Sequence, residues 1–191
     1  MTYNYNQDSL NAYYKSEYGS IVKGTCSMVA GTSIAEYYTR NNYATTLKKS
    51  QFGKIFCSLV LLGYGTGIYD GTTTRSSKVY KVIDAYYKIY NRYGYGKYAS
   101  SNVAAKIESY NRNKKPVIGH FKAPNGEGHA MVIMGYYEVT IEYKKKKNSA
   151  TQTEKIRYYA VNDGWNLCYS GDARVSYIRD SYLKNGITIF R

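Results

Sequence analysis

The chain has 191 residues, a length that fits one domain with enough core to fold without disulfides or metal ions. Its three cysteines, Cys26, Cys57 and Cys168, are odd in number and far apart, which excludes a disulfide framework. The formal net charge of +14 comes from 27 Lys and Arg against 13 Asp and Glu, so the chain is strongly basic.

The basic residues are scattered along the chain and form no known nucleic-acid-binding motif. An excess of cations attracts an anionic surface or an acidic substrate, but it also keeps an ordinary protein surface solvated. The scatter favours the solvated surface and speaks against specific nucleic-acid binding. The one dense run, Lys144–Lys147, is typical of a hairpin tip. The 26 tyrosines occur throughout the chain and mark no single binding platform.

The first part of the chain is predicted to be helical. Residues 1–20 are polar and predict an extended lead-in with one short helix. Apolar residues then recur at helical spacing, at Cys26, Ala30, Ile34 and Tyr38. Thr25 is suited to cap that helix. Further helices are predicted at 51–62, 77–91 and 100–113, with a loop at 63–77, a Gly-rich break at 93–97 and a cap at Ser101 or Asn102.

The second part is predicted to be mostly strands. The segments rich in Val, Ile and Tyr are 116–121, 128–143, 154–163, 174–178 and 187–191. Helices followed by strands predict the α+β class and not a parallel α/β sheet. We therefore expect one domain over 1–191, with a helical part at about 1–113 packed on an antiparallel sheet or half-barrel at about 114–191.

Cys26 is a candidate nucleophile because it falls in the first turn of a predicted helix. A thiolate at that position is stabilised by the positive helix end and by backbone N–H groups that have no intrahelical partner. The same N–H groups can stabilise an oxyanion. A free cysteine is also commonly a small buried apolar residue, so the position alone does not decide its role.

Any histidine chemistry must use His120 or His129, since the chain has no other histidine. His129 follows a Gly-Glu-Gly segment and opens the apolar strand AMVIM, so it can face a cleft while the strand anchors it. His120 competes for the role, but it lies inside the strand at 116–121 and lacks the Gly-flanked entry that precedes His129. Either one could also be an ordinary core or surface histidine.

Asp163 closes the predicted strand at 154–163 and is followed by Gly164 and Trp165. An acid at such a strand end can hold an imidazole in the tautomer that catalysis requires. Asn162 points to the opposite face of the strand and is the runner-up for that role. An Asp-Gly pair is also a common β-turn in any protein.

Together these segments resemble the papain-like cysteine peptidase superfamily, and most closely its bacterial C39-like and streptopain-like branches. GTCSMVAGTSIAEYY is similar to their nucleophile helix, GHAMVIMGYYEV to their histidine strand, and YYAVNDGW to their Asn/Asp-x-Trp strand. The resemblance implies a papain-like fold and hydrolysis of peptide bonds through a thioacyl-enzyme. Cys26 would be the nucleophile, His129 the general base and Asp163 the orienting acid, with Trp165 as a secondary residue. It implies a peptide or protein substrate, and no cofactor or metal.

The chain departs from that superfamily in front of the nucleophile. A glutamine usually precedes the cysteine and completes the oxyanion hole, but no glutamine lies between Asp8 and Cys26. Ser20, Tyr18 and Asn11 are the candidate substitute donors, and the backbone N–H of Cys26 together with another donor is the alternative. Two alternatives therefore stay open: a catalytically weak or inactive papain-like binding module, and an acyl or amide transferase that uses the same triad.

The compartment is not readable from the residues. No run of 18 apolar residues occurs, so we expect no transmembrane segment. The first residues lack the basic and apolar stretches of a signal peptide, although a signal could have been removed. Three unpaired cysteines permit the cytosol, whereas the branches that the chain resembles are often exported.

Overall fold

The computed structural model of the chain describes residues 6–40, 52–90, 96–122, 125–164 and 175–190. The helices are α1 (Gln7–Tyr18), α2 (Cys26–Arg40), α3 (Phe52–Gly65), α4 (Val79–Tyr90) and α5 (Val103–Arg112). The strands are β1 (Gly96–Ala99), β2 (Val117–Lys122), β3 (Gly128–Tyr143), β4 (Gln152–Asn162), β5 (Ser176–Arg179) and β6 (Leu183–Phe190). Two short 3-10 helices span Ser76–Lys78 and Asp180–Tyr182.

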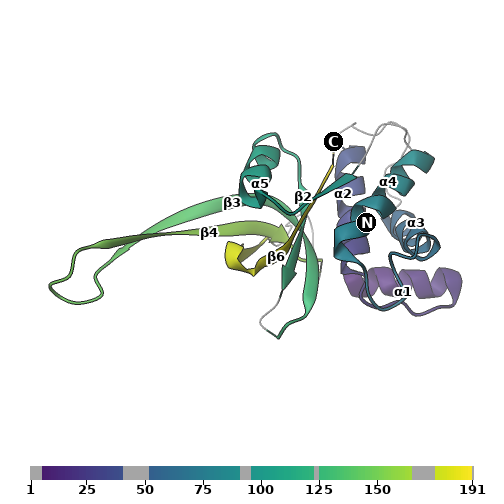
Figure 1. The fold of residues 1–191 in the computed structure, drawn as a ribbon. Helices are drawn as coiled ribbons and strands as arrows, with labels where there is room; N and C mark the ends of the chain where they lie inside the picture. The colour runs from purple at the N-terminus through teal and green to yellow at the C-terminus, as the bar shows by residue number, and fades with distance from the viewer. Residues whose placement is uncertain (1–5, 41–51, 91–95, 123–124, 165–174, 191) are drawn as a thin grey trace.

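The strands form one antiparallel sheet in the order β1-β6-β2-β3-β4-β5. The sheet is open, because β1 and β5 lie at its two edges and do not pair with each other. Figure 1 shows the N-terminal helices gathered on one side of this sheet. The protein is therefore α+β, with N-terminal helices packed against a C-terminal antiparallel sheet.

The two faces of the sheet contribute to two separate cores because neighbouring strand residues point in opposite directions. Ile118 of β2 and Val132 of β3 belong to the core that α1–α4 form. Val117 and Ile133, one residue away on the same strands, pack with Ile107 of α5. Helix α5 therefore covers the face opposite α1–α4, and the sheet lies between two helical layers.

Two local predictions differ from the structure in extent. The helix predicted in the lead-in is present as α1, which spans 12 residues, and the Asn6 side chain caps it by accepting a hydrogen bond from the Ser9 N–H. The expected break at 93–97 contains the start of β1, where Gly96 pairs with Phe190 of β6. Pairing with a distant strand decides this element, and a Gly-rich segment gives no local signal for it.

The β3–β4 hairpin extends far beyond the rest of the fold (Figure 1). Its two strands are 16 and 11 residues long and pair without interruption from Gly135 to Tyr143. Lys144–Lys147 are exposed at its tip, which confirms the prediction of a solvated turn there. Among the described residues, no helix is long and apolar enough to cross a membrane.

Candidate active site

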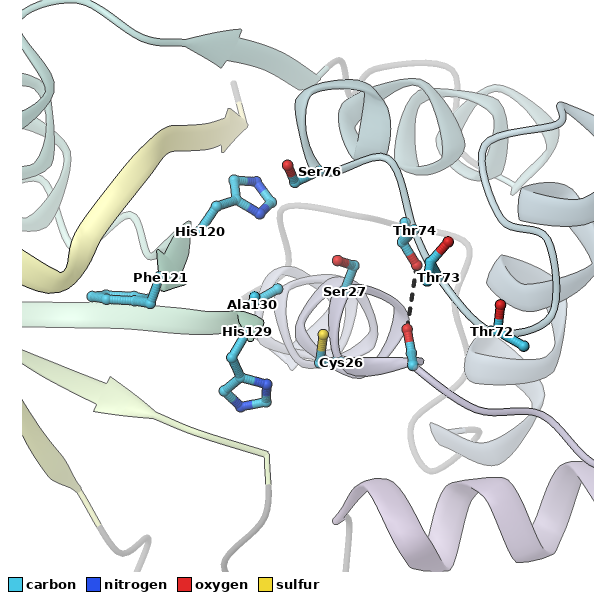
Figure 2. Close-up of a pocket in the computed structure, with 12 residues that line it drawn as sticks. Cys26, Ser27, Thr72, Thr73, Thr74, Ser76, His120, Phe121, His129 and Ala130 are labelled. Carbon is cyan, nitrogen blue, oxygen red and sulfur yellow. Dashed lines mark hydrogen bonds between the residues drawn. The ribbon is translucent and has the colours of Figure 1, made fainter. Parts of the chain in front are cut away.

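A cavity of about 240 Å³ lies where the start of α2 meets β2, β3 and the loop before α4 (Figure 2). Its walls carry one thiol, two imidazoles and several hydroxyl groups. The lining residues are Gly24, Cys26, Ser27, Thr72, Thr73, Thr74, Ser76, His120, Phe121, Gly128, His129 and Ala130. The structure thus brings Cys26 and His129 together, although they are distant in the sequence.

The hydroxyl-bearing wall is fixed by a close approach of two backbones. Gly24 has a φ of +56°, and a Cβ on this residue would lie 1.8 Å from the carbonyl oxygen of Thr72. No residue other than glycine fits there without moving the loop. The Lys23 N–H also donates to the Gly71 carbonyl at 3.1 Å.

The loop that carries these threonines is held by its own side chains. One carboxylate oxygen of Asp70 accepts hydrogen bonds from the N–H groups of Thr72 and Thr73 at 2.8 and 2.7 Å. The two threonine hydroxyls donate to the same carboxylate. These bonds hold the pKa of Asp70 well below its usual range, and the backbone N–H of Thr73 has the largest effect. The wall is therefore preformed.

Cys26 is the first residue of α2 and is half-buried. The helix begins here because the Thr25 carbonyl accepts the N–H groups of Met28 and Val29 at 2.8 and 2.9 Å. The N–H groups of Cys26 and Ser27 come before them, where no helical carbonyl precedes to accept them. Thr25 thus stands at the predicted cap position, but its hydroxyl donates to the Asn11 side chain of α1 at 2.8 Å.

His129 is the second residue of β3, at the predicted start of the strand, and its ring is partly buried. Its Nε2 lies 2.7 Å from the backbone carbonyl oxygen of Asp163. A carbonyl oxygen can only accept, so Nε2 carries the proton and Nδ1 carries the lone pair. Burial lowers the pKa of His129, while the bond to the Asp163 carbonyl and the charge of Asp163 act to raise it. The neutral tautomer therefore has Nδ1 as its basic atom.

Asp163 and His129 also line a second, larger groove of about 560 Å³. The Asp163 carboxylate accepts a hydrogen bond from the Ser176 hydroxyl at 3.1 Å. Asn162 lies instead in a different pocket, beside Ser33 of α2, and its side chain accepts the Gly164 N–H at 3.0 Å. The two neighbouring side chains therefore serve different faces of the sheet, as strand alternation predicts.

His120 enters the same cavity as Cys26, from β2 (Figure 2). It is 2% exposed, and its Nε2 lies 3.1 Å from the Thr188 hydroxyl. Burial lowers the pKa of His120 to about 4. It is therefore a neutral buried side chain at neutral pH.

Of the predicted secondary residues, Ser20 is not brought to the cavity, and Trp165 is not among the described residues. Ser20 is exposed beyond the end of α1, where its hydroxyl points to the Tyr18 carbonyl at 3.5 Å, and it is not among the described lining residues. Trp165 lies outside the described residues, as does Cys168.

Two groups of site residues were missed by sequence reasoning. The Thr and Ser side chains of 72–76 were assigned only to a loop, and the signal that could have found them is the glycine at position 24. The aromatic side of the larger groove was missed as well, since Tyr177 and Tyr182 fall in short elements. Nothing local distinguishes those two among the 26 tyrosines.

Among the described residues, no group of three His, Cys, Asp or Glu side chains could hold a metal ion. No protein-family model matches the chain, and a comparison with curated proteins gives no match either.

Proposed function

We propose that the protein is a papain-like cysteine hydrolase that cleaves amide bonds through Cys26 and His129. The observation that carries this proposal is the shared cavity: a thiol at a helix N-terminus and an imidazole line it together. The imidazole donates from Nε2 to the Asp163 carbonyl, so Nδ1 is the ring nitrogen that can take up the thiol proton. This is the division of roles that a thiol nucleophile needs from its base.

In the first step, His129 Nδ1 takes the proton of the Cys26 thiol. The thiolate attacks the carbonyl carbon of the substrate, and the π electrons of that bond move to the oxygen. The Nε2 bond to Asp163 keeps the ring in place, and the Asp163 carboxylate favours the imidazolium by its charge. The backbone carbonyl of Asp163 therefore orients the His129 ring, and the side chain of Asp163 stabilises the imidazolium.

The negative oxygen of the tetrahedral intermediate needs donors that stand in place before reaction. The N–H groups of Cys26 and Ser27 at the start of α2 are suited to this, since the positive helix end adds to their effect. Of the donors that the sequence offered, Ser20 is exposed beyond the end of α1 and has no part in this arrangement.

Collapse of the intermediate breaks the C–N bond, and the imidazolium of His129 gives its proton to the leaving amine. The leaving part of the substrate must therefore lie on the His129 side of the thiol. The groove of about 560 Å³ begins there and is mostly apolar, with Lys122 and Arg179 at its walls. It suits a leaving segment with apolar side chains. Water then attacks the thioester, again with His129 as the base, and releases the acid.

A papain-like binding module without turnover is the second candidate. The observation that favours it is the absence of a glutamine between Asp8 and Cys26. An acyl transferase would use the same thioester and differ only in the nucleophile that attacks it.

The test is alkylation by iodoacetamide at pH 7, with the modified residue mapped by mass spectrometry. Cys26 should react at least about tenfold faster than Cys57, because burial raises the pKa of Cys57 to about 11. His129→Gln should slow Cys26 alkylation by about tenfold or more, whereas the matched His120→Gln should change it little. Cys26→Ala should reduce peptide turnover by about a thousandfold.

The outcomes separate the candidates. Faster alkylation of Cys57 or Cys168 would mean that the nucleophile is wrong. Equal alkylation of Cys26 in the wild type and in His129→Gln would mean that the two residues do not act as a pair. Fast, His129-dependent alkylation without turnover of any peptide in a substrate library would favour the binding module.

A further inference from the structure

The outer part of the β3–β4 hairpin touches little besides itself. Every residue from 140 to 155 is exposed except Ser149. A two-stranded ribbon of this kind is marginally stable in water, because it buries few side chains. Its length and projection therefore need a reason other than the core (Figure 1).

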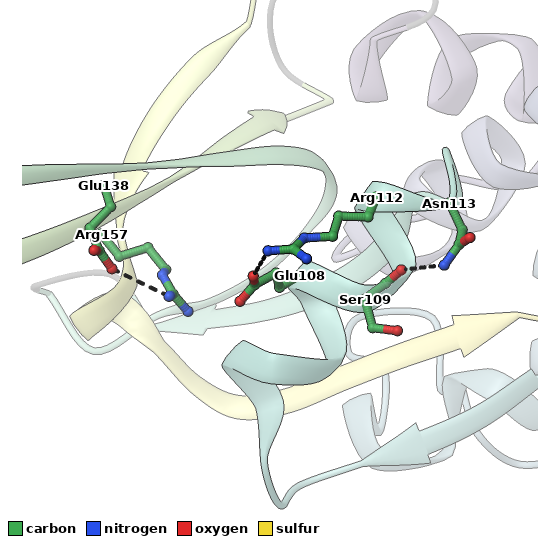
Figure 3. A network of polar contacts seen from close by, with 6 residues as sticks. All are labelled: Glu108, Ser109, Arg112, Asn113, Glu138 and Arg157. Carbon is green, nitrogen blue, oxygen red and sulfur yellow. Dashed lines mark hydrogen bonds and ion pairs between the residues drawn. The ribbon is translucent and has the colours of Figure 1, made fainter.

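Most charged side chains along the shaft of this hairpin are paired, and Glu142 is the exception among the described residues there. Glu138 of β3 lies 3.4 Å from both Lys155 and Arg157 of β4, and Figure 3 shows the second of these contacts. Glu154 of β4 pairs with Arg179 of β5 at 3.0 Å. These pairs neutralise most of the charge on the shaft.

The tip is different, because Lys144–Lys147 form no ion pair with a carboxylate of the described residues. The tip is also ordered by its own hydrogen bonds, since the Ser149 N–H and hydroxyl donate to the Lys146 carbonyl at 3.0 and 2.8 Å. The Lys146 N–H donates back to the Ser149 hydroxyl at 3.0 Å. Four positive charges are thus held together at the far end of the molecule.

Apolar side chains stand directly beside these lysines. Ile141 and Tyr143 are 41% and 38% exposed and lie two residues apart on β3, so they point to the same side. A tyrosine next to lysines suits the boundary of a bilayer, where the ring meets acyl chains and the hydroxyl and ammonium groups meet headgroups.

We propose that the hairpin tip, Ile141–Lys147, docks on a lipid bilayer that carries anionic headgroups. The four lysines meet the headgroup phosphates, and Tyr143 with Ile141 enters the interface. A nucleic-acid duplex would meet the four lysines as well, but it offers no acyl region for Ile141 and Tyr143 to enter. Glu142 alternates with these two residues along β3 and points to the other side of the strand. Such docking would bring the cavity to substrates at the membrane surface.

The experiment measures binding of the full chain to vesicles of phosphatidylcholine and of an equimolar mixture with phosphatidylglycerol. Binding should require phosphatidylglycerol and weaken with salt. Replacement of Lys144–Lys147 by glutamine should weaken binding by about a hundredfold or more, since each lysine near such a surface contributes about 1 kcal/mol.

The matched control removes the same number of charges elsewhere. Four exposed lysines on the helices, Lys15, Lys54, Lys81 and Lys88, are replaced by glutamine. This variant should lose less than about threefold in binding, because its charges are scattered. Tyr143→Ser, which keeps all charges, should weaken vesicle binding by about threefold to tenfold. Turnover of a short neutral peptide should stay unchanged in all three variants.

Equal binding to both kinds of vesicle would overturn the proposal, as would an equal loss in the scattered-lysine variant. Tighter binding to a DNA duplex than to anionic vesicles at the same salt would assign the tip to nucleic acid instead. Unchanged vesicle binding by Tyr143→Ser would show that Tyr143 does not enter the bilayer interface. These outcomes are independent of the thiol chemistry, because Cys26 alkylation reports that site separately.

Discussion

The cavity at the start of α2 and the tip of the β3–β4 hairpin both carry polar residues, but they hold them in opposite ways. At the cavity, the buried His120 ring lies 3.1 Å from the Thr188 hydroxyl, and the partly buried His129 ring lies 2.7 Å from the Asp163 carbonyl. The backbone of Gly24 is closely packed against Thr72 there. At the tip, Lys144–Lys147 extend into solvent. A change at the cavity must therefore disturb its neighbours, whereas a change at the tip alters only a local charge.

This difference separates two kinds of effect that a mutation can have. Removing the partner of a buried polar group lowers stability strongly, because water cannot reach the group to replace the lost hydrogen bond. Exposed charges contribute little to stability but act on partners over about a Debye length of 10 Å. The predictions below test whether the cavity is as tightly specified as its contacts indicate.

Gly24→Ala should give the largest effect on stability. The new Cβ would meet the Thr72 carbonyl at 1.8 Å, and the left-handed φ adds strain for any residue with a side chain. We expect a loss of about 4 kcal/mol in the free energy of unfolding, measured by urea denaturation. Cys26 alkylation should slow as well, because the shifted loop forms one wall of the cavity.

Gly19→Ala is the matched control, since Gly19 has a φ of +69° and open space where its Cβ would stand. It should lose only about 1 kcal/mol, which is the strain without the clash. Equal losses in both variants would show that the contact between Gly24 and Thr72 does not constrain the cavity.

The free energy of unfolding should fall at acid pH because of the buried His120. Its pKa is about 4 in the folded chain, against about 6.5 for an unfolded histidine. As pH falls below 6.5, the unfolded chain takes up the proton first, so this group removes stability until pH 4 and little more below it. The loss between pH 7 and pH 4 should be about 3 kcal/mol.

The pKa of His129 is lowered too, so His129 also removes stability at acid pH. Because His129 does this equally in the wild type and in His120→Gln, the difference between the two proteins isolates the contribution of His120. The difference in unfolding free energy between the two proteins should shrink as pH falls from 7 to 4. A constant difference over that range would mean that His120 is solvated or charged in the folded protein.

Much of the fold was predictable from local pattern. The helical spacing after Cys26 and the Val- and Ile-rich segments gave the positions of α2 and β3 closely. β1 was not predictable, because four residues around a glycine become a strand only when β6 pairs with them. The path of α5 to the opposite face of the sheet was also beyond local pattern, since it depends on which core Ile107 joins.

The site was predictable only in part. Residue order predicted Cys26 and His129 as partners, and the structure places them in one cavity. Sequence could not show that the Asp163 backbone carbonyl, and not only its side chain, holds the imidazole. It also offered Ser20 as one substitute donor, because distance along the chain does not tell that this residue is exposed beyond the end of α1.

That backbone contact sharpens the expected difference between Asp163 and Asn162. Replacing either residue by alanine keeps the Asp163 carbonyl that accepts from His129 Nε2. Asp163→Ala removes the carboxylate, whose charge raises the pKa of His129, and the partner of the Ser176 hydroxyl. Asn162→Ala removes only a bond to the Gly164 N–H, in a pocket away from His129.

Asp163→Ala should therefore reduce kcat/KM about tenfold, because the imidazolium of His129 loses the negative charge that stabilises it. The pKa of His129, followed by NMR titration, should fall in that variant, since the charge that raised it is gone. Asn162→Ala should lose less than about threefold and leave the titration unchanged. The reverse ranking, with circular dichroism unchanged, would transfer the orienting role to Asn162. A loss of a thousandfold in Asp163→Ala would mean that the carboxylate and not the carbonyl holds the ring, because charge stabilisation alone is too weak for such an effect.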